Sequence, residues 1–192
     1  AFVAMDAIVN HMAKVRYMFN GQFSVPMVIR TTTGGGKQLG ATHSHAPEPI
    51  FAQFPGFYVA VPGTAYDAKG MLKASIRDDN PVMFIEHKML YKNEGPVPEE
   101  DYVIPLGVAD VKREGSDVTI LSYSRMVLRA LEAAEKLAEE GVSAVITKAE
   151  LVKNDYNLSP SRYVAQNGGE ALEKVRSGSY DLVTLDLIMP EM

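Results

Sequence analysis

A histidine pair stands in a polar stretch of the chain, at His43 and His45 with Ser44 between them. If this stretch is extended, both imidazoles point the same way, because alternate side chains of a strand share a face. Together with Glu48 they could ligate a metal, although two or three ligands make an incomplete site. A histidine here could also transfer protons near neutral pH. Without a metal, the pattern favours a polar loop with one hydrogen-bonded histidine.

A glycine-rich stretch with a lysine, Gly34 to Lys37, precedes the histidines. A phosphate-binding Walker loop needs a glycine five places before its Gly-Lys pair and a Ser or Thr after it. Thr31 and Gln38 occupy those two positions, so the motif fails twice. A flexible or partner-contacting loop is the favoured interpretation.

Three acidic or histidine residues follow predicted strands. Glu86 and His87 end one strand, at the edge where parallel α/β sheets place ligand contacts. Asp186 lies at the end of another strand, where a phospho-acceptor carboxylate could sit. Each of them can equally be a strand end that meets solvent.

The elements that would position these residues follow from hydrophobic spacing. Strands are expected at 25–30, 57–61, 81–86, 118–121, 142–146 and 181–186, and helices at 1–18, 65–77, between Ser124 and Gly141, and at 169–177. Thr64 and Asp67 predict a capping box, and Ser124 predicts another N-cap. Strand–helix–strand order with nearly continuous apolar strands predicts an α/β fold with a parallel sheet covered on both faces.

Composition limits the class of protein. The 192 residues carry a net charge of −5, are 46% hydrophobic and contain no cysteine. Cysteine-dependent chemistry, disulfides and thiolate metal sites are therefore excluded. The 19 Lys and Arg form no dense run, so we expect no nucleic-acid partner. No apolar stretch is long enough to span a membrane and no signal peptide is recognisable, so we expect no membrane partner and a cytoplasmic protein.

Longer motifs resemble a known family. The stretch YDAKGMLKASIRDDNPV and the HSH-containing loop GATHSHAPEP occur in the order and spacing of the beta subunit of thiamine-dependent 2-oxo-acid dehydrogenases, of pyruvate or acetoin type. The resemblance covers about residues 1–146. It implies thiamine diphosphate and magnesium shared with an alpha subunit in a heterotetramer, decarboxylation of a 2-oxo acid, and transfer of the acyl group to a lipoyl-bearing acyltransferase.

The resemblance also assigns residues. His43 matches the active-site loop histidine, whose implied role is proton transfer or substrate positioning near the cofactor. In some members a potassium ion is held largely by backbone carbonyls. The matching positions are Met27, Ser75, Ile76, Asp78 and Asn80.

The implied architecture is a transketolase-like pyrimidine-binding domain, truncated at its N-terminus, followed by a partial transketolase C-terminal-like unit. We expect these at 1–90 and 117–148, joined by an extended linker over 91–116. The family's cofactor-activating glutamate lies before the first residue of this sequence, so the resemblance predicts a fragment that is inactive alone. The alternative is a non-catalytic α/β binding or assembly module, or a composite chain without native function.

The final stretch, 149–192, resembles other proteins. Residues 150–164 look like a segment of type I restriction methyltransferase subunits, without their catalytic motif. Residues 165–192 look like part of a response-regulator receiver domain, in which Asp186 matches the phospho-acceptor. The resemblance predicts a composite tail with a receiver-like βαβ fragment, and a truncated phospho-receiver is a third functional interpretation.

Overall fold

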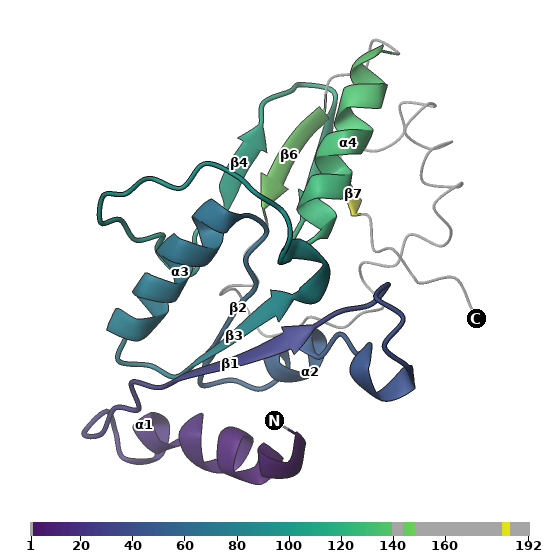
Figure 1. Cartoon of the computed structure of the whole chain (residues 1–192). Helices are drawn as coiled ribbons and strands as arrows, with labels where there is room; N and C mark the ends of the chain where they lie inside the picture. Colours follow the sequence, from purple (N-terminus) through teal and green to yellow (C-terminus); the bar gives the residue numbers. More distant parts are fainter. Residues whose placement is uncertain (1, 140–143, 149–181, 185–192) are drawn as a thin grey trace. The chain divides into compact units, whose positions relative to one another are not determined.

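The computed structural model describes residues 2–139, 144–148 and 182–184, the last two segments as backbone (Figure 1). The chain divides into two compact units, one extending to Val108 and the other beginning at Ala109. The first contains η1 (Phe2–Ala4), η2 (Ala7–Met12), α1 (Val15–Met18), β1 (Val28–Thr33), η3 (Ala41–His43), α2 (Glu48–Ala52), β2 (Tyr58–Ala60), α3 (Ala65–Arg77), β3 (Val82–His87) and η4 (Lys88–Leu90).

The first unit is built on a three-stranded parallel sheet in the order β1-β3-β2. β3 lies in the middle, and its residues Val82 to Ile85 are completely buried. Such an apolar run is shielded from water only where both faces of the sheet are covered. Pairing of Thr33 with His87 brings the carboxyl ends of β1 and β3 to the same edge.

Helix α3 covers one face of this sheet, and the sequence determines where it begins. The Thr64 hydroxyl accepts a hydrogen bond from the Asp67 N–H at 3.1 Å, and the Asp67 carboxylate accepts one from the Thr64 N–H at 3.1 Å. The predicted capping box is therefore confirmed. The core between helix and sheet consists of Ala60, Met71, Val82 and Phe84.

The N-terminal helical segment and α2 lie on the other side of the sheet (Figure 1). The single helix predicted over 1–18 is instead three short helical pieces, although its apolar face is buried at Ile8, Val9, Met12 and Ala13. Gly56, with φ +114°, accommodates the close approach of this segment. A Cβ on Gly56 would lie 1.9 Å from the Ala13 carbonyl oxygen.

The exposed face of α3 binds an extended segment of the same unit, residues 98–104, which we call the strap. Lys69 Nζ donates to backbone carbonyls of the strap, including that of Pro98. Asp101 is held by Lys73 at 2.5 Å and by Arg77 at 3.0 Å. Hydrogen bonds from these two cations lower the pKa of Asp101.

Apolar contacts complete the attachment of the strap. The Tyr102 ring stacks on Tyr66 with centroids 4.5 Å apart, and its hydroxyl donates to the Tyr66 carbonyl at 2.9 Å. The Ile104 N–H donates to the Gly70 carbonyl at 3.2 Å. Gly70 is required at this contact because a Cβ would lie 2.6 Å from Ile104 and 2.7 Å from Tyr102.

The second unit contains β4 (Asp110–Arg113), β5 (Val118–Ser122), α4 (Met126–Glu139), β6 (Ala144–Lys148) and β7 (Leu182–Thr184). Its sheet has the order β4-β6-β5-β7, with β5 parallel to β6 and β7 and with β4 antiparallel to β6. Its core joins β5 to α4 through Val118, Ile120, Ala130 and Ala134.

Three expectations need correction. The predicted linker 91–116 is not one extended connection, because the strap packs on α3 and Asp110–Arg113 forms a strand. The predicted strand 25–30 begins three residues later, at Val28, because Pro26 has no N–H to give to a ladder. Ser124 does not cap α4 with its side chain, since its buried Oγ has no partner among the described residues and its φ is +54°.

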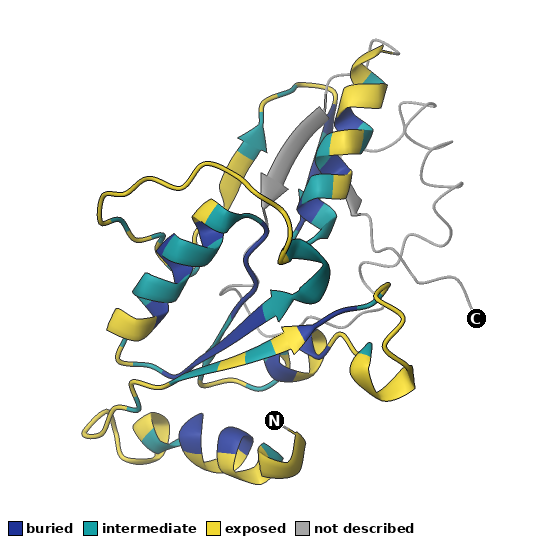
Figure 2. Cartoon of the chain, viewed as in Figure 1, coloured by how far each residue is buried: buried dark blue, intermediate teal, exposed yellow. Residues whose placement is uncertain are grey.

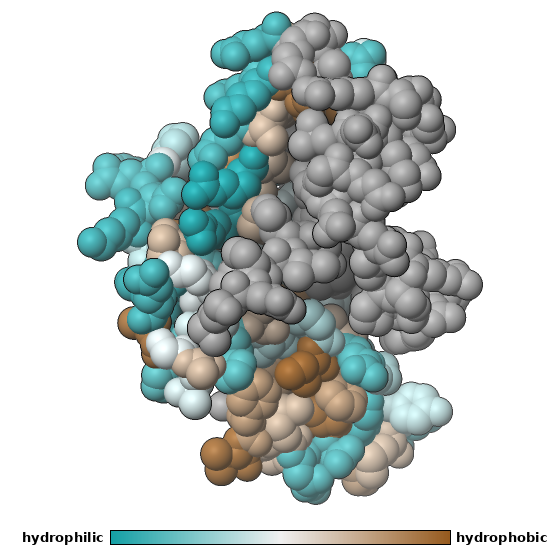
Figure 3. Space-filling view, turned by 90° about the vertical axis from the view of Figure 1, so that its right-hand side faces the viewer, coloured by the Kyte–Doolittle hydropathy of each residue, from teal (hydrophilic) through white to brown (hydrophobic). Residues whose placement is uncertain are grey.

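Burial is concentrated around β3 and the inner faces of α3 and α4 (Figure 2). Several large apolar side chains in the N-terminal segment of the first unit are nevertheless exposed, namely Phe2, Val3, Tyr17, Met18, Phe19, Phe23 and Met27. Figure 3 shows apolar surface on the lower part of one face of the molecule. Contiguous exposed apolar surface is typical of a protein–protein contact.

The substitution Gly70→Ala tests the strap. The added methyl group must displace Ile104 or Tyr102, so we expect the free energy of unfolding to fall by about 1–2 kcal/mol. Limited proteolysis should also cut the strap faster. Urea unfolding and mass spectrometry of the fragments measure both effects. Gly95→Ala is the matched control, because no atom lies within 4 Å of its added Cβ. Equal stability and cleavage of the two variants would contradict this packing.

Candidate functional site

The carboxyl edge of the first sheet carries the loop that contains the histidine pair. The loop leaves β1 after Thr33 and folds back over the strand end. The Thr33 hydroxyl donates to the His45 carbonyl at 2.9 Å, and the Gly34 N–H points to the same oxygen at 3.4 Å. His45 is therefore anchored through its backbone, which leaves its imidazole available.

His43 ends the short helical turn η3 in the middle of this loop. Its N–H lies 3.4 Å from the Gly40 carbonyl, which also accepts from the Ser44 hydroxyl at 2.9 Å. Gly40 has φ +79°, a conformation that glycine adopts at no steric cost. The turn holds the His43 side chain at the surface.

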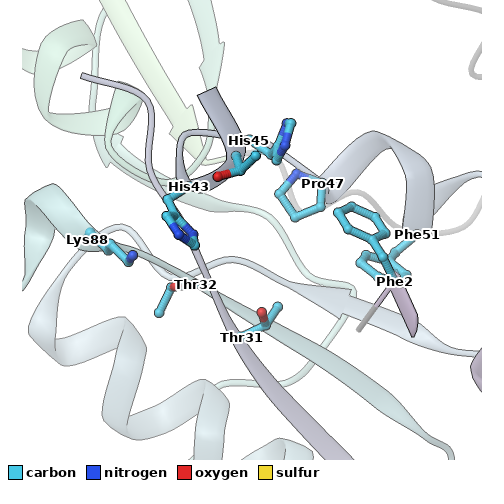
Figure 4. Close-up of a pocket in the computed structure, with 9 residues that line it drawn as sticks. Phe2, Thr31, Thr32, His43, His45, Pro47, Phe51 and Lys88 are labelled. Atoms are coloured by element: carbon cyan, nitrogen blue, oxygen red, sulfur yellow. The ribbon is translucent and has the colours of Figure 1, made fainter. Parts of the chain in front are cut away.

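Both histidines border a hollow of about 140 Å³. Its wall consists of Phe2, Thr31, Thr32, Thr42, His43, His45, Pro47, Phe51 and Lys88. Figure 4 shows Lys88, Thr32 and His43 on one side and Pro47, Phe51 and Phe2 on the other. The pocket thus has a polar side and an apolar side.

The apolar side is made by aromatic rings from distant parts of the sequence. Phe2 and Phe51 lie nearly parallel, with centroids 6.4 Å apart and an angle of 8° between the rings. The edge of His45 faces Phe2 at 6.3 Å. Phe51 is completely buried, whereas Phe2 is half exposed, so Phe51 fixes the position of this wall.

Glu48 is a buried carboxyl group beneath the loop, only 3% exposed, and its Oε2 has no hydrogen-bond partner among the described residues. Burial raises the pKa of Glu48, while hydrogen bonds from its own backbone and from Thr33 oppose the rise.

The other predicted residues lie elsewhere. Glu86, at the end of β3, is held by Arg30 at 2.6 Å and by the Tyr91 hydroxyl at 3.2 Å, which makes it part of a surface ion pair. Burial and the Glu86 charge raise the pKa of Tyr91. The His87 Nδ1 accepts from the Met89 N–H at 3.1 Å and so caps η4. Asp186 lies outside the described residues and stays a prediction.

The five positions of the potassium hypothesis lie just before β1, in the last turn of α3 and in the connection from α3 to β3. Met27 precedes β1, and its carbonyl accepts from the Val82 N–H at 2.9 Å. Asp78 ends α3, and its carboxylate accepts from the Asn80 N–H at 2.7 Å. The remaining two, Ser75 and Ile76, lie in the last turn of α3.

A metal bound by side chains has little support in this structure. Within residues 2–139, no group of three or more His, Asp or Glu is arranged to hold an ion. The structure does not bring His43, His45 and Glu48 together as such a group. No helix in the described part of the chain is both long and apolar enough to cross a membrane.

The family follows from comparison with known domains. Residues 1–94 match the transketolase pyrimidine-binding domain, and residues 107–154 match the transketolase C-terminal domain. The chain carries transketolase-type domains. The second match extends past residue 149 into the predicted tail, whose resemblance to methyltransferase and receiver proteins stays a prediction.

The relatives of these transketolase-type domains include several dehydrogenase subunits. The chain is 49% identical over 142 residues to 2-oxoisovalerate dehydrogenase subunit beta of Bacillus subtilis, covering 73% of this chain and 43% of that protein. It is 51% identical over 144 residues to the beta subunit of acetoin:2,6-dichlorophenolindophenol oxidoreductase of Cupriavidus necator, covering 75% and 43%. The chain thus spans less than half the length of these relatives.

Two further matches extend the comparison. Pyruvate dehydrogenase E1 component subunit beta of Cyanidium caldarium is 39% identical over 185 residues, covering 90% of this chain and 57% of that protein. A solved structure titled split gene transketolase, inactive beta4 tetramer, has a TM-score of 0.57 at 25% identity, covering 78% of this chain and 47% of that one. The α/β fold with transketolase-like domains is confirmed.

Sequence reasoning found His43 but missed the pocket around it. Phe2 and Phe51 are 49 positions apart in the numbering, and nothing in their local spacing indicates that they stack. The sequence could have indicated Lys88 as a pocket residue. It directly follows His87, the end of β3, and parallel sheets bind ligands at the carboxyl ends of their strands.

The substitution Glu48→Gln tests the buried carboxyl group. The folded state holds its proton above the ordinary pKa of 4.5, whereas the unfolded state releases it. The native free energy of unfolding should therefore decrease as pH rises from the ordinary value through the raised one. Gln keeps the shape and a donor, so this decrease should disappear.

Urea unfolding between about pH 4 and about pH 8 measures the difference. Glu94→Gln removes an exposed carboxylate of the same unit and is the matched control. A pH dependence that is unchanged in Glu48→Gln would contradict the raised pKa.

Proposed function

We propose that the chain supplies the pyrimidine-binding side of a thiamine-diphosphate-dependent 2-oxo-acid dehydrogenase beta subunit and is inactive alone. With an alpha subunit it would decarboxylate a 2-oxo acid and transfer the acyl group to lipoamide on a lipoyl-bearing acyltransferase. The observation that carries this proposal is the position of His43 at the pocket, in a chain 49% identical over 142 residues to such a subunit.

Thiamine diphosphate, with magnesium, would supply the electron sink for decarboxylation. The described residues offer no side-chain cluster for magnesium, so in this proposal the ion is held by the alpha subunit. What the chain contributes is a histidine on a rigid turn, beside a hollow that is aromatic on one side. An imidazole at this place can hold or deliver a proton to a substrate that enters from the exposed side.

The exposed apolar surface of the N-terminal segment supports the proposal that this chain contacts a partner chain. Tyr17 is 88% exposed and Met18 is 66% exposed, and both lie in the short helix α1. Burying such side chains removes apolar area from water and stabilises association. We assign this surface to the contact with the alpha subunit in a heterotetramer.

Replacement of His43 by alanine tests its role in the complex of the chain with an alpha subunit, thiamine diphosphate and magnesium. Reduction of 2,6-dichlorophenolindophenol in the presence of a 2-oxo acid measures turnover. Loss of a proton-transfer group should lower the rate by about 100-fold or more. His11→Ala, which changes an exposed histidine that does not line the pocket, should leave the rate unchanged. Equal rates for the two variants would contradict the role of His43.

A second candidate is a non-catalytic assembly module. One observation favours it, since a solved structure similar to this chain is titled an inactive beta4 tetramer. The same assay separates the two functions. A stable complex with the alpha subunit that shows no dye reduction would support the module and overturn the catalytic proposal.

Potassium is a further part of the proposal. The carbonyl groups of Met27, Ser75, Ile76, Asp78 and Asn80 would hold the ion near the last turn of α3. An ion that binds only the folded state raises the melting temperature, by about 2–4 °C for each kcal/mol that it adds to the free energy of unfolding. Thermal unfolding in potassium chloride should therefore occur above that in choline chloride at equal ionic strength. Identical melting curves in the two salts would exclude the site.

A further inference from the structure

Lys88 is the residue of the pocket that the proposed function leaves without a role. It begins η4 directly after β3 and is half-buried. Its stem lies against Gly34, where an added Cβ would be 3.3 Å from the Lys88 Cβ. This contact limits the directions that the side chain can take, and Lys88 lines the pocket together with Thr32 (Figure 4).

No neighbour among the described residues neutralises the charge of Lys88. Among residues 2–139, no hydrogen bond or ion pair to its amino group is found, and no carboxylate lines the pocket. The acid that is nearest in sequence, Glu86, is occupied by Arg30 and Tyr91. A cation in a hollow that holds no counter-ion among the described residues favours the binding of an anion.

The groups beside Lys88 suit the head of a small carboxylate. Thr31, Thr32, Thr42 and His43 line the same hollow, and threonine hydroxyl and histidine imidazole groups can donate hydrogen bonds. Charge-assisted bonds from lysine to a carboxylate are stronger than neutral ones. The aromatic wall of Phe2 and Phe51 can take a short hydrocarbon group.

We propose that Lys88 is the counter-ion of a small carboxylate ligand in this pocket, with the hydrocarbon part of the ligand against Phe2 and Phe51. Resting on the proposed function, this carboxylate belongs to the 2-oxo acid. A diphosphate fits less well, because it carries no apolar part to cover the aromatic wall. The small hollow of about 140 Å³ also favours a short ligand.

Titration of the full chain alone tests this assignment. The probes are 2-oxobutanoate, its uncharged amide and inorganic phosphate, and the imidazole NMR signals of His43 and His45 report binding. Lys88→Met should weaken 2-oxobutanoate binding by about tenfold or more, because a charged hydrogen bond is lost. The amide should bind equally to the parent and to Lys88→Met. Lys88→Arg should keep most of the affinity, since it retains the charge.

Lys92→Met is the matched control, because Lys92 is an exposed lysine of the same segment outside the pocket. The proposal is overturned if Lys88→Met binds 2-oxobutanoate as tightly as the parent, or if the acid and the amide bind equally. It is also overturned if phosphate binds more tightly than 2-oxobutanoate, or if the parent binds no 2-oxobutanoate at millimolar concentration.

Failure of this proposal is distinguishable from failure of the proposed function. Binding that depends on Lys88, in a chain that gives no turnover with an alpha subunit, would support the carboxylate site and overturn the catalytic function. Turnover that depends on His43 but has the same KM for the 2-oxo acid in Lys88→Met would overturn the carboxylate site alone.

Discussion

The first unit depends on the burial of a single strand. Val82 to Ile85 of β3 are fully buried, with β1 and β2 paired on their two sides and helices packed above and below. Four consecutive apolar side chains stay out of water only where both faces of the sheet are covered. Its position then fixes the sheet edge, where β1 ends at Thr33 and β3 ends at His87. The loop with His43 and the turn with Lys88 are both attached to that edge.

The pocket combines buried residues with an exposed histidine. Phe51 and Glu48 are buried and hold α2 under the loop, whereas His43 is exposed and can meet a partner-bound ligand. The Thr33 hydroxyl donates to the His45 carbonyl and so ties the loop to the end of β1. Lys88 lines the pocket together with threonines and histidines, and none of its described lining residues is a carboxylate. The arrangement is selective for small anions with an apolar part, by charge on one side and by aromatic area on the other.

Local signals in the sequence predicted the elements that they control directly. Helix α3 begins and ends where expected because Thr64 and Asp67 cap it, and β3 was recognisable as an apolar run before a polar end. The strap was missed, although Lys69, Lys73 and Arg77 stand at four-residue spacing on α3 opposite an acidic stretch. Only part of the candidate site could be predicted, because a sequence motif identified His43 but not the residues around it. The contacts of Lys88 and Phe2 arise only when separate segments meet at the folded sheet edge.

The central claim is that this chain presents a folded transketolase-type pyrimidine-binding unit to an alpha subunit. Sedimentation velocity of the chain mixed with an alpha subunit of a 2-oxo-acid dehydrogenase, with thiamine diphosphate and magnesium present, tests it most directly. The account predicts one faster-sedimenting species that contains both chains, and its loss when Tyr17 and Met18 are replaced by serine. Two separate boundaries at the sedimentation coefficients of the isolated proteins would contradict it.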